Sequence, residues 1–232
     1  MGILASRVRA ASRLLRPLAG SLALLAAFAA LGVSVHVGLW RAADRALLLS
    51  LVAEAPCALV RAGHAVSHWL SAEFSVLYAS GAAAVAARRR GWPAAWLLVG
   101  LLATAPVELA AKHVVEQPPP RLLETLAPRD CGPEGYGLAT VDLPHVFPSG
   151  SVTRLAYFTT LAVGAAGGPH RGARAARAAL VLAAAAAAGT RAVIAWHWPT
   201  DIVGGVLLGT AAAWLAARLS QCRPRSGASG TG

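Results

Sequence analysis

Residues 191–201 place a histidine and an aspartate at a spacing that suits catalysis. His197 and Asp201 are four residues apart, so they share one face if a helix begins between them, and Pro199 is typical of a first helical turn. A carboxylate beside an imidazole fixes its tautomer and stabilises the imidazolium. Arg191, six residues before the histidine, could fork onto phosphate oxygens. An interfacial histidine beside an N-terminal aspartate cap, with Arg191 snorkelling, is the alternative interpretation.

Two other segments carry groups that suit an anion. Lys112 is the only lysine among the 21 lysines and arginines, and its compact ammonium suits one phosphate oxygen; a snorkelling interfacial lysine is the alternative. Ser149 and Gly150 form a turn after Pro148 that opens a predicted helix. Backbone amides, the positive helix end and the serine hydroxyl together make an anion site, although a simple helix cap has the same sequence.

The composition indicates an all-α integral membrane bundle. Of 232 residues, 56% are hydrophobic and 13% are charged, and the mean hydropathy is +0.57, which is typical of a polytopic membrane protein in contact with the lipid bilayer. The net charge of +11 comes from short arginine clusters between apolar runs, so we expect no nucleic-acid partner. The three cysteines form no Cys/His cluster, so we expect no structural metal ion and no cofactor.

We expect about six transmembrane helices, at residues 18–40, 66–87, 93–113, 150–168, 177–195 and 200–219. They form one domain over 18–219, between a basic N-terminal segment (1–17) and a disordered tail (220–232). The first apolar run is as long as a full span, so we interpret it as a retained helix and not as a cleaved signal peptide. The stretch 44–65 is apolar but carries four charged residues, which favours an interfacial or re-entrant helix; a seventh span is the alternative.

Arginine placement predicts the topology. Clusters precede the first span, follow the last and occupy alternate loops between them, so both termini are expected in the cytoplasm of a multi-pass cell-membrane protein. The loop 114–149 and the site residues then lie on the extracytoplasmic side. Cys57 and Cys131 also face outward in this topology, where they either form a disulfide or remain two free thiols.

The three segments together resemble the type 2 phosphatidic acid phosphatase superfamily, which also contains haloperoxidases. The motifs cover about residues 112–201, and the pattern Thr190-Arg191…His197…Asp201 matches apart from a serine-to-threonine change. The resemblance implies that His197 attacks phosphorus to form a phosphohistidine and that Asp201 orients it. It further implies a metal-independent phosphate clamp made of Lys112, Ser149, Gly150 and Arg191.

Two positions depart from the family pattern. Pro119 stands seven residues after Lys112, where the family has arginine, and Ser151 stands where the family has the histidine that protonates the leaving group. General acids of this kind contribute typically 10²–10⁴-fold to rate. Expelling a phosphate from a diphosphate needs less help than expelling an alkoxide, so the sequence favours a diphosphate lipid such as a polyprenyl diphosphate.

Three nearby residues could compensate for these departures. Arg121 could replace the missing arginine or be a solvated loop residue. Arg154 could supply the lost positive charge or simply pair with Glu108. His145 could act as a displaced acid or be a free loop histidine.

The sequence therefore predicts a membrane lipid phosphatase acting on a lipid phosphate or diphosphate. The alternative is a catalytically impaired family member that binds lipid phosphate, or partner proteins, without turnover. A transporter is disfavoured because the polar groups gather at one interface and not at mid-membrane.

Overall fold

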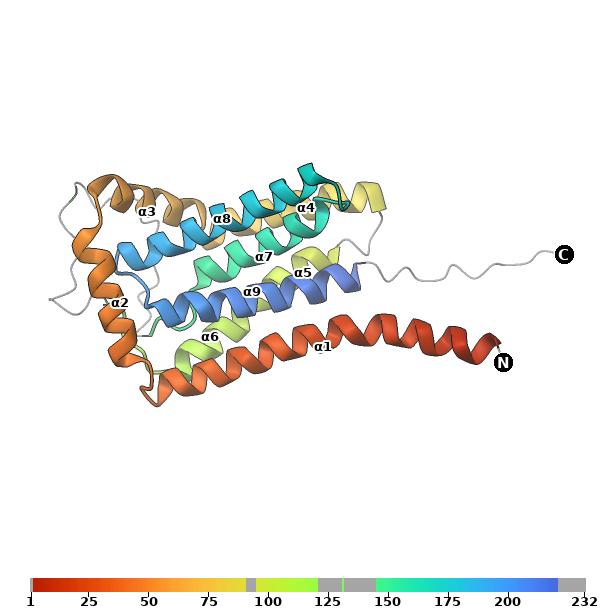
Figure 1. The fold of residues 1–232 in the computed structure, drawn as a ribbon, viewed down its shortest axis with the longest axis horizontal. Helices are drawn as coiled ribbons and strands as arrows, with labels where there is room; N and C mark the ends of the chain where they lie inside the picture. Colours follow the sequence, from red (N-terminus) through yellow and green to blue (C-terminus); the bar gives the residue numbers. More distant parts are fainter. Residues whose placement is uncertain (1, 91–94, 121–130, 132–144, 221–232) are drawn as a thin grey trace.

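The computed structural model describes residues 2–90, 95–120, 131 and 145–220, and these residues confirm the predicted all-α class (Figure 1). The helices within them are α1 (Gly2–His36), α2 (Arg41–Glu54), α3 (Cys57–Trp69), α4 (Ala72–Arg90), α5 (Trp96–Leu102), α6 (Thr104–Val114), α7 (Gly150–Ala165), α8 (Arg171–Val193) and α9 (Pro199–Leu219).

Four of the helical segments are long and apolar enough to cross a membrane: Leu18–His36, Trp96–Val114, Arg171–Val193 and Pro199–Leu219. The bent pair α2 and α3 would make a fifth. Predicted span 66–87 falls on the end of α3 and on α4, and predicted span 150–168 falls on the 16-residue α7. Length and hydropathy thus identify four or five spans in the described chain, and the number six stays a prediction.

The stretch 44–65 is not one helix. α2 and α3 are bent by 116° at a short break, and Pro56 stands directly before α3, where its ring is suited to a helix start. Figure 1 shows α2 lying across one end of the bundle, whereas α3 runs along it beside α8. Only α2 therefore lies as an interfacial helix would, and the interfacial or re-entrant placement of 44–65 stays a prediction.

A proline also explains the break between α5 and α6. Pro106 has no backbone N–H, so the carbonyl of Leu102 loses its normal helical donor. The two short helices meet at Ala103, and together they form the apolar segment Trp96–Val114. This broken span ends at the same end of the bundle as α2 (Figure 1).

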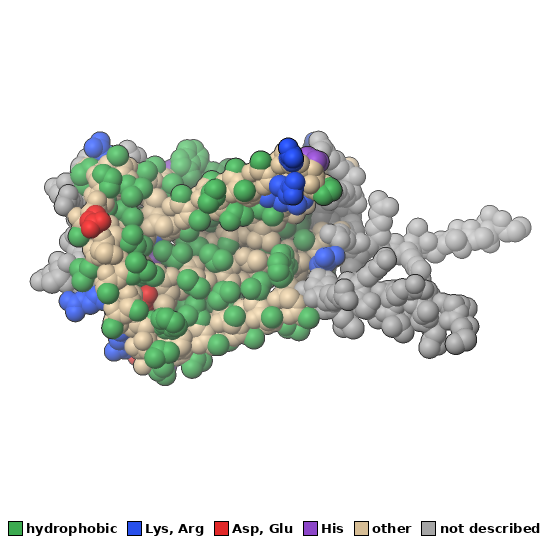
Figure 2. All heavy atoms as spheres, viewed as in Figure 1, with side chains coloured by type: hydrophobic (Ala, Val, Ile, Leu, Met, Phe, Trp, Pro, Cys, Tyr) green, Lys and Arg blue, Asp and Glu red, His purple; other side chains and the backbone are tan. Residues whose placement is uncertain are grey.

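The two ends of the bundle differ. α1 begins and α9 ends at one end, while α7 and α9 both begin at the other (Figure 1). Figure 2 shows hydrophobic side chains along the flank of the visible face and charged side chains mainly towards its ends. This distribution is what a membrane-spanning bundle requires, because charges are costly in the hydrocarbon layer.

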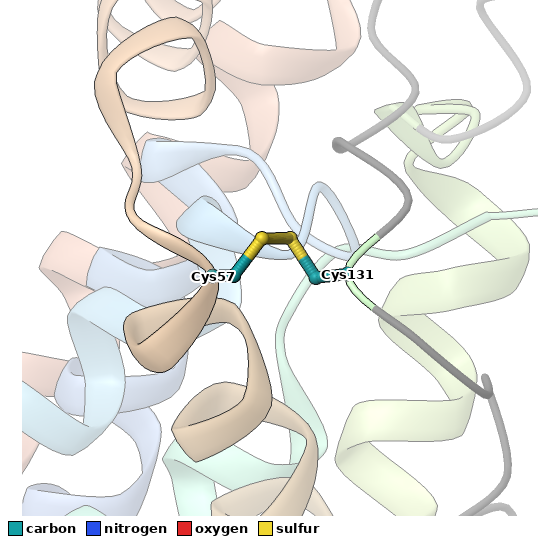
Figure 3. The surroundings of a disulfide bond; sticks show 2 residues. All are labelled: Cys57 and Cys131. Carbon is teal, nitrogen blue, oxygen red and sulfur yellow. A yellow bond between two sulfur atoms is a disulfide. The ribbon is translucent and has the colours of Figure 1, made fainter.

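A disulfide joins Cys57, at the start of α3, to Cys131 (Figure 3). Of the two alternatives left by the sequence, the structure has the bonded pair. Cys131 also packs against a small buried cluster that includes Val193 and Ile194 at the end of α8. The bond therefore lies at the end of the bundle where α8 turns into α9.

α7 and α9 pack closely because α9 presents glycines to α7. A Cβ at Gly205 would lie 2.7 Å from the carbonyl oxygen of Ser149, and one at Gly209 would overlap the carbonyl oxygen of Thr153. Small residues of this kind let membrane helices approach backbone to backbone. The contact fixes the first turn of α7 against the first turns of α9.

Gly209→Ala should lower the free energy of unfolding by about 1–3 kcal/mol, because the added methyl group meets backbone that cannot rotate away. The measurement is thermal or denaturant unfolding in detergent micelles. Gly189→Ala is the matched control: its Cβ would meet nothing within 4 Å, and alanine is the better helix former by up to about 1 kcal/mol. Equal stability of the two variants would contradict the packing argument.

Candidate active site

Most of the predicted site residues gather at the end of the bundle opposite the start of α1 and the end of α9. They come from the end of α6, the segment leading into α7, the end of α8 and the start of α9 (Figure 1). α7 and α9 both begin here, so two helices direct their positive ends to the same region. The following contacts connect these elements.

His197 and Asp201 lie in the turn from α8 into α9, as their spacing predicts. Nδ1 of His197 is 3.4 Å from Oδ2 of Asp201, and the backbone N–H of Trp198 donates to the same carboxylate oxygen at 2.9 Å. The aspartate is completely buried. Its carboxylate is therefore held by the backbone and faces the imidazole.

Arg191, at the end of α8, is hydrogen-bonded to the same turn through its backbone carbonyl. The backbone N–H groups of Trp196 and His197 donate to its carbonyl oxygen at 3.2 and 3.4 Å. Its guanidinium carbon lies 4.9 Å from the centroid of the Trp196 ring, and Nη1 donates to the hydroxyl of Ser67 on α3. Nε is buried and makes no hydrogen bond within the described part of the chain. A buried, unpaired guanidinium donor is uncommon and fits a group that receives an oxyanion.

Ser149 links α7 to α9. Its backbone N–H donates to the carbonyl oxygen of Asp201 at 3.1 Å, and its hydroxyl lies 3.3 Å from that of Ser151. Both serines are buried. The predicted turn therefore stands directly beside the histidine–aspartate segment.

Lys112 is bound to the chain that leads into this turn. Nζ donates to the carbonyl oxygens of Val146 and Pro148 at 3.3 and 3.0 Å, and it lies 3.8 Å from Oε1 of Glu108 one turn earlier. The side chain is buried at the end of α6. The lysine is thus held against the Ser149 turn.

Gly150 has a role that the sequence did not reveal. A Cβ at this position would collide with the carboxylate of Glu108. The glycine therefore makes room for the acidic partner of Lys112, in addition to any close approach of a phosphate.

Arg154 pairs with Glu108, which was one of the two expectations for it. Nη1 lies 3.9 Å from Oε2 of Glu108, while Nε and Nη2 donate to the carbonyl oxygen of Leu70 at 3.2 and 3.1 Å. Leu70 is the C-terminal cap of α3, so Arg154 joins α7, α6 and α3.

The remaining auxiliary residues are less well placed. His145 is half-buried, and no hydrogen bond links it to Ser151, although the structure describes both residues. Arg121 lies outside the described residues. Pro119, where the family has arginine, is buried. Among the described residues, no three His, Cys, Asp or Glu side chains are placed to hold a metal ion.

Sequence reasoning missed three polar residues near the site: Asp44, Ser67 and Gln117. Asp44 and Gln117 contact Thr200 at the start of α9, and Ser67 contacts Arg191. They carry no motif, and their partners are 83 to 156 residues away in the chain. The one signal in the sequence was a charged or polar residue within an apolar segment.

Comparison with known proteins identifies the family and the fold. The model of the PAP2 superfamily matches residues 93–225, which is more than half of the chain. The chain belongs to the PAP2 superfamily. The matched region contains Lys112, the Ser149 turn and the whole of α8 and α9.

A solved PAP2 structure has the same fold. It is described as the first transmembrane PAP2 type phosphatidylglycerolphosphate phosphatase from Bacillus subtilis, and the TM-score is 0.70 at 18% sequence identity. The similarity covers 89% of this chain and 98% of that one. No curated protein matches the chain. The fold is therefore that of a PAP2 membrane phosphatase.

Arg154→Leu should lower the free energy of unfolding of this PAP2 protein by about 2–3 kcal/mol, because the half-buried carboxylate of Glu108 loses one of its two cations and the carbonyl of Leu70 loses its donor. Unfolding in detergent measures the change. Arg177→Leu is the control, since Nη2 of Arg177 also donates to two carbonyl oxygens, those of Gly167 and Gly168, but these hydrogen bonds are exposed. A loss of unfolding free energy no larger than in the control would show that Arg154 does not hold α7 to α6 and α3.

Proposed function

We propose that this PAP2 protein is a membrane lipid phosphatase that acts at the extracytoplasmic face through a phosphohistidine on His197. The observation that carries the proposal is the contact of His197 with the buried Asp201, at the bundle end where two helices begin. A nucleophile with its orienting carboxylate, beside groups suited to an anion, is the arrangement that phosphoryl transfer requires.

The imidazole tautomer follows from the aspartate contact. With its proton on Nδ1, His197 donates a hydrogen bond to Asp201, and the lone pair is then on Nε2. Nε2 attacks phosphorus, the P–N bond forms, and the bond from phosphorus to the leaving oxygen breaks. The imidazole becomes positively charged in this step, and the carboxylate 3.4 Å away stabilises that charge.

The clamp stabilises the charge on the phosphoryl oxygens. Arg191 offers Nε, which has no partner among the described residues, Lys112 offers an ammonium near the turn, and the first turn of α7 offers backbone amides and the Ser149 hydroxyl. These donors are fixed by packing before substrate arrives, so little reorganisation is needed during the reaction. In the second step, water attacks the phosphohistidine, the P–N bond breaks, inorganic phosphate leaves and His197 is regenerated.

The lipid nature of the substrate is supported by an apolar groove of about 550 Å³ beside the clamp. Phe28 and Gly32 of α1 form one wall, Ala110 and Ala111 of α6 form the other, and Phe147 also lines it. Ala111 directly precedes Lys112, and Phe147 is two residues before Ser149. A hydrocarbon chain in this groove would therefore lie next to the residues proposed to bind its phosphate.

The extracytoplasmic assignment is supported by charge and by the disulfide. Arg171, Arg174 and Arg177 begin α8, and the proposed site lies at the other end of that helix. Arginine-rich ends favour the cytoplasm. The bond between Cys57 and Cys131 is at the site end, and disulfides persist in oxidising compartments.

The purified protein in detergent should release inorganic phosphate from a polyprenyl diphosphate or from phosphatidic acid in the presence of a chelator. His197→Ala should abolish release, because the nucleophile is lost, and radiolabelled phosphate should be trapped on wild-type protein but not on this variant. His113→Ala is the matched control, since that histidine is exposed at the end of α6. Binding of the lipid phosphate without turnover in wild type would instead favour the non-catalytic alternative.

The chain should hydrolyse a polyprenyl diphosphate faster than the corresponding monophosphate, because Ser151 is a poor acid in the position of the family's histidine. Ser151→His should raise the monophosphate rate by about tenfold or more and change the diphosphate rate less, as expected for a restored general acid. Ser151→Asn is the control, because an amide cannot donate a proton to the leaving group. A wild-type preference for the monophosphate would overturn the leaving-group argument.

A further inference from the structure

Asp44 is a buried carboxylate that belongs to none of the sequence motifs. It lies on α2, is only 3% exposed, and contacts a residue 156 positions later in the chain. Oδ1 accepts the backbone N–H of Thr200 at 3.1 Å, and Oδ2 accepts the Thr200 hydroxyl at 2.6 Å. The side-chain amide of Gln117 donates to Oδ2 and to the Thr200 hydroxyl, at 3.3 Å each.

α9 needs such an acceptor because the side chain of its N-cap residue cannot provide one. Trp198 is the residue at the N-cap, and its side chain has no oxygen to accept a hydrogen bond. Pro199 has no N–H, so Thr200 carries the first backbone donor of the helix that must find a partner. The nearest carboxylate in the sequence, Asp201, already accepts from the Trp198 N–H and faces His197.

We propose that Asp44 is a positioning residue, which caps α9 from outside so that Asp201 remains paired with His197; this inference rests on the proposed function. Negative charge is favourable at a helix N-terminus, and a carboxylate can accept several hydrogen bonds at once. Asp44 therefore does for α9 what a serine or aspartate at the N-cap does in most helices. The carboxylate of Asp201 is left to orient the nucleophile.

The structure indicates what removal of Asp44 would cause. The N–H and hydroxyl of Thr200 would be left buried without their acceptor, which is unfavourable. Oδ1 of Asp201 makes no hydrogen bond within the described residues, so this carboxylate is the nearest replacement. Rotation of Asp201 towards Thr200 would take Oδ2 away from the imidazole.

The test is steady-state kinetics of Asp44→Ala, Thr200→Val and the double variant. Asp44→Ala should lower kcat about 10- to 100-fold, as small misplacements of a reacting group do, and Thr200→Val should lower it less, because its backbone N–H still donates to Oδ1 of Asp44. KM should change by no more than about threefold, because phosphate binding is left to α6, α7 and α8. The double variant should be no worse than Asp44→Ala alone, since Asp44→Ala already removes the hydroxyl contact that Thr200→Val removes. Asp44→Asn, which keeps one carbonyl acceptor, should recover part of the loss.

Glu54→Gln is the matched control, because Glu54 is an exposed acid on the same helix. Its kcat and KM should equal those of wild type. Additive losses in the double variant, or wild-type kcat in Asp44→Ala, would overturn the inference. A higher KM with wild-type kcat would also overturn the inference.

A second measurement separates this inference from the proposed function. Amide hydrogen exchange of the peptide spanning residues 196–206 should be faster in Asp44→Ala and Thr200→Val than in Glu54→Gln, whether or not the protein turns over lipid. Inactive wild-type protein with this exchange pattern would defeat the phosphatase proposal and support the cap. Equal exchange in all variants would defeat the cap.

Discussion

Close packing of α7 on α9 is the constraint on which the site depends. The two helices begin at the same end of the bundle, and glycines on α9 let the backbone of α7 approach it directly. The Ser149 N–H can then bond the carbonyl of Asp201, which puts the turn into α7 beside the histidine–aspartate pair. Two positive helix ends meet there, so the fold itself makes the region attractive to an anion before any side chain is considered.

Three charged side chains at this end, Lys112, Glu108 and Arg154, are largely buried. Because water screens them little, each one affects the others. Glu108 lies between Lys112 and Arg154, and each cation also donates to backbone carbonyls. A buried ion pair of this kind adds little net stability compared with apolar packing. Its better explanation is geometric: Glu108, seated against Gly150, orders α6 and α7 relative to each other, while Arg154 joins them to the end of α3. Arg191 differs, because one of its donors has no partner in the described protein.

The features that could be predicted from the sequence are those that depend on residues close together in the chain. His197 and Asp201 are brought together by one helical turn, and the helix start at Gly150 follows from its own local signals, so both were readable from spacing. Asp44, Ser67 and Gln117 were not, because their contacts depend on how distant helices pack. Asp44 in particular stood in an apolar stretch whose four charged residues favoured an interfacial or re-entrant helix. That interpretation suits α2, which crosses the bundle end, but it gave no reason to direct the carboxylate inward onto α9.

The two halves of the proposed reaction are supported unequally. Attack on phosphorus needs an oriented imidazole and fixed positive charge, and these groups are anchored by hydrogen bonds from four elements. Departure of the leaving group needs a proton donor near the first turn of α7, where Ser151 offers only a hydroxyl beside that of Ser149. A hydroxyl can orient or stabilise an oxygen, but it is a poor acid near neutral pH. In the proposed reaction, the chemistry of the substrate's own leaving group would therefore be the main determinant of which lipid phosphates are cleaved.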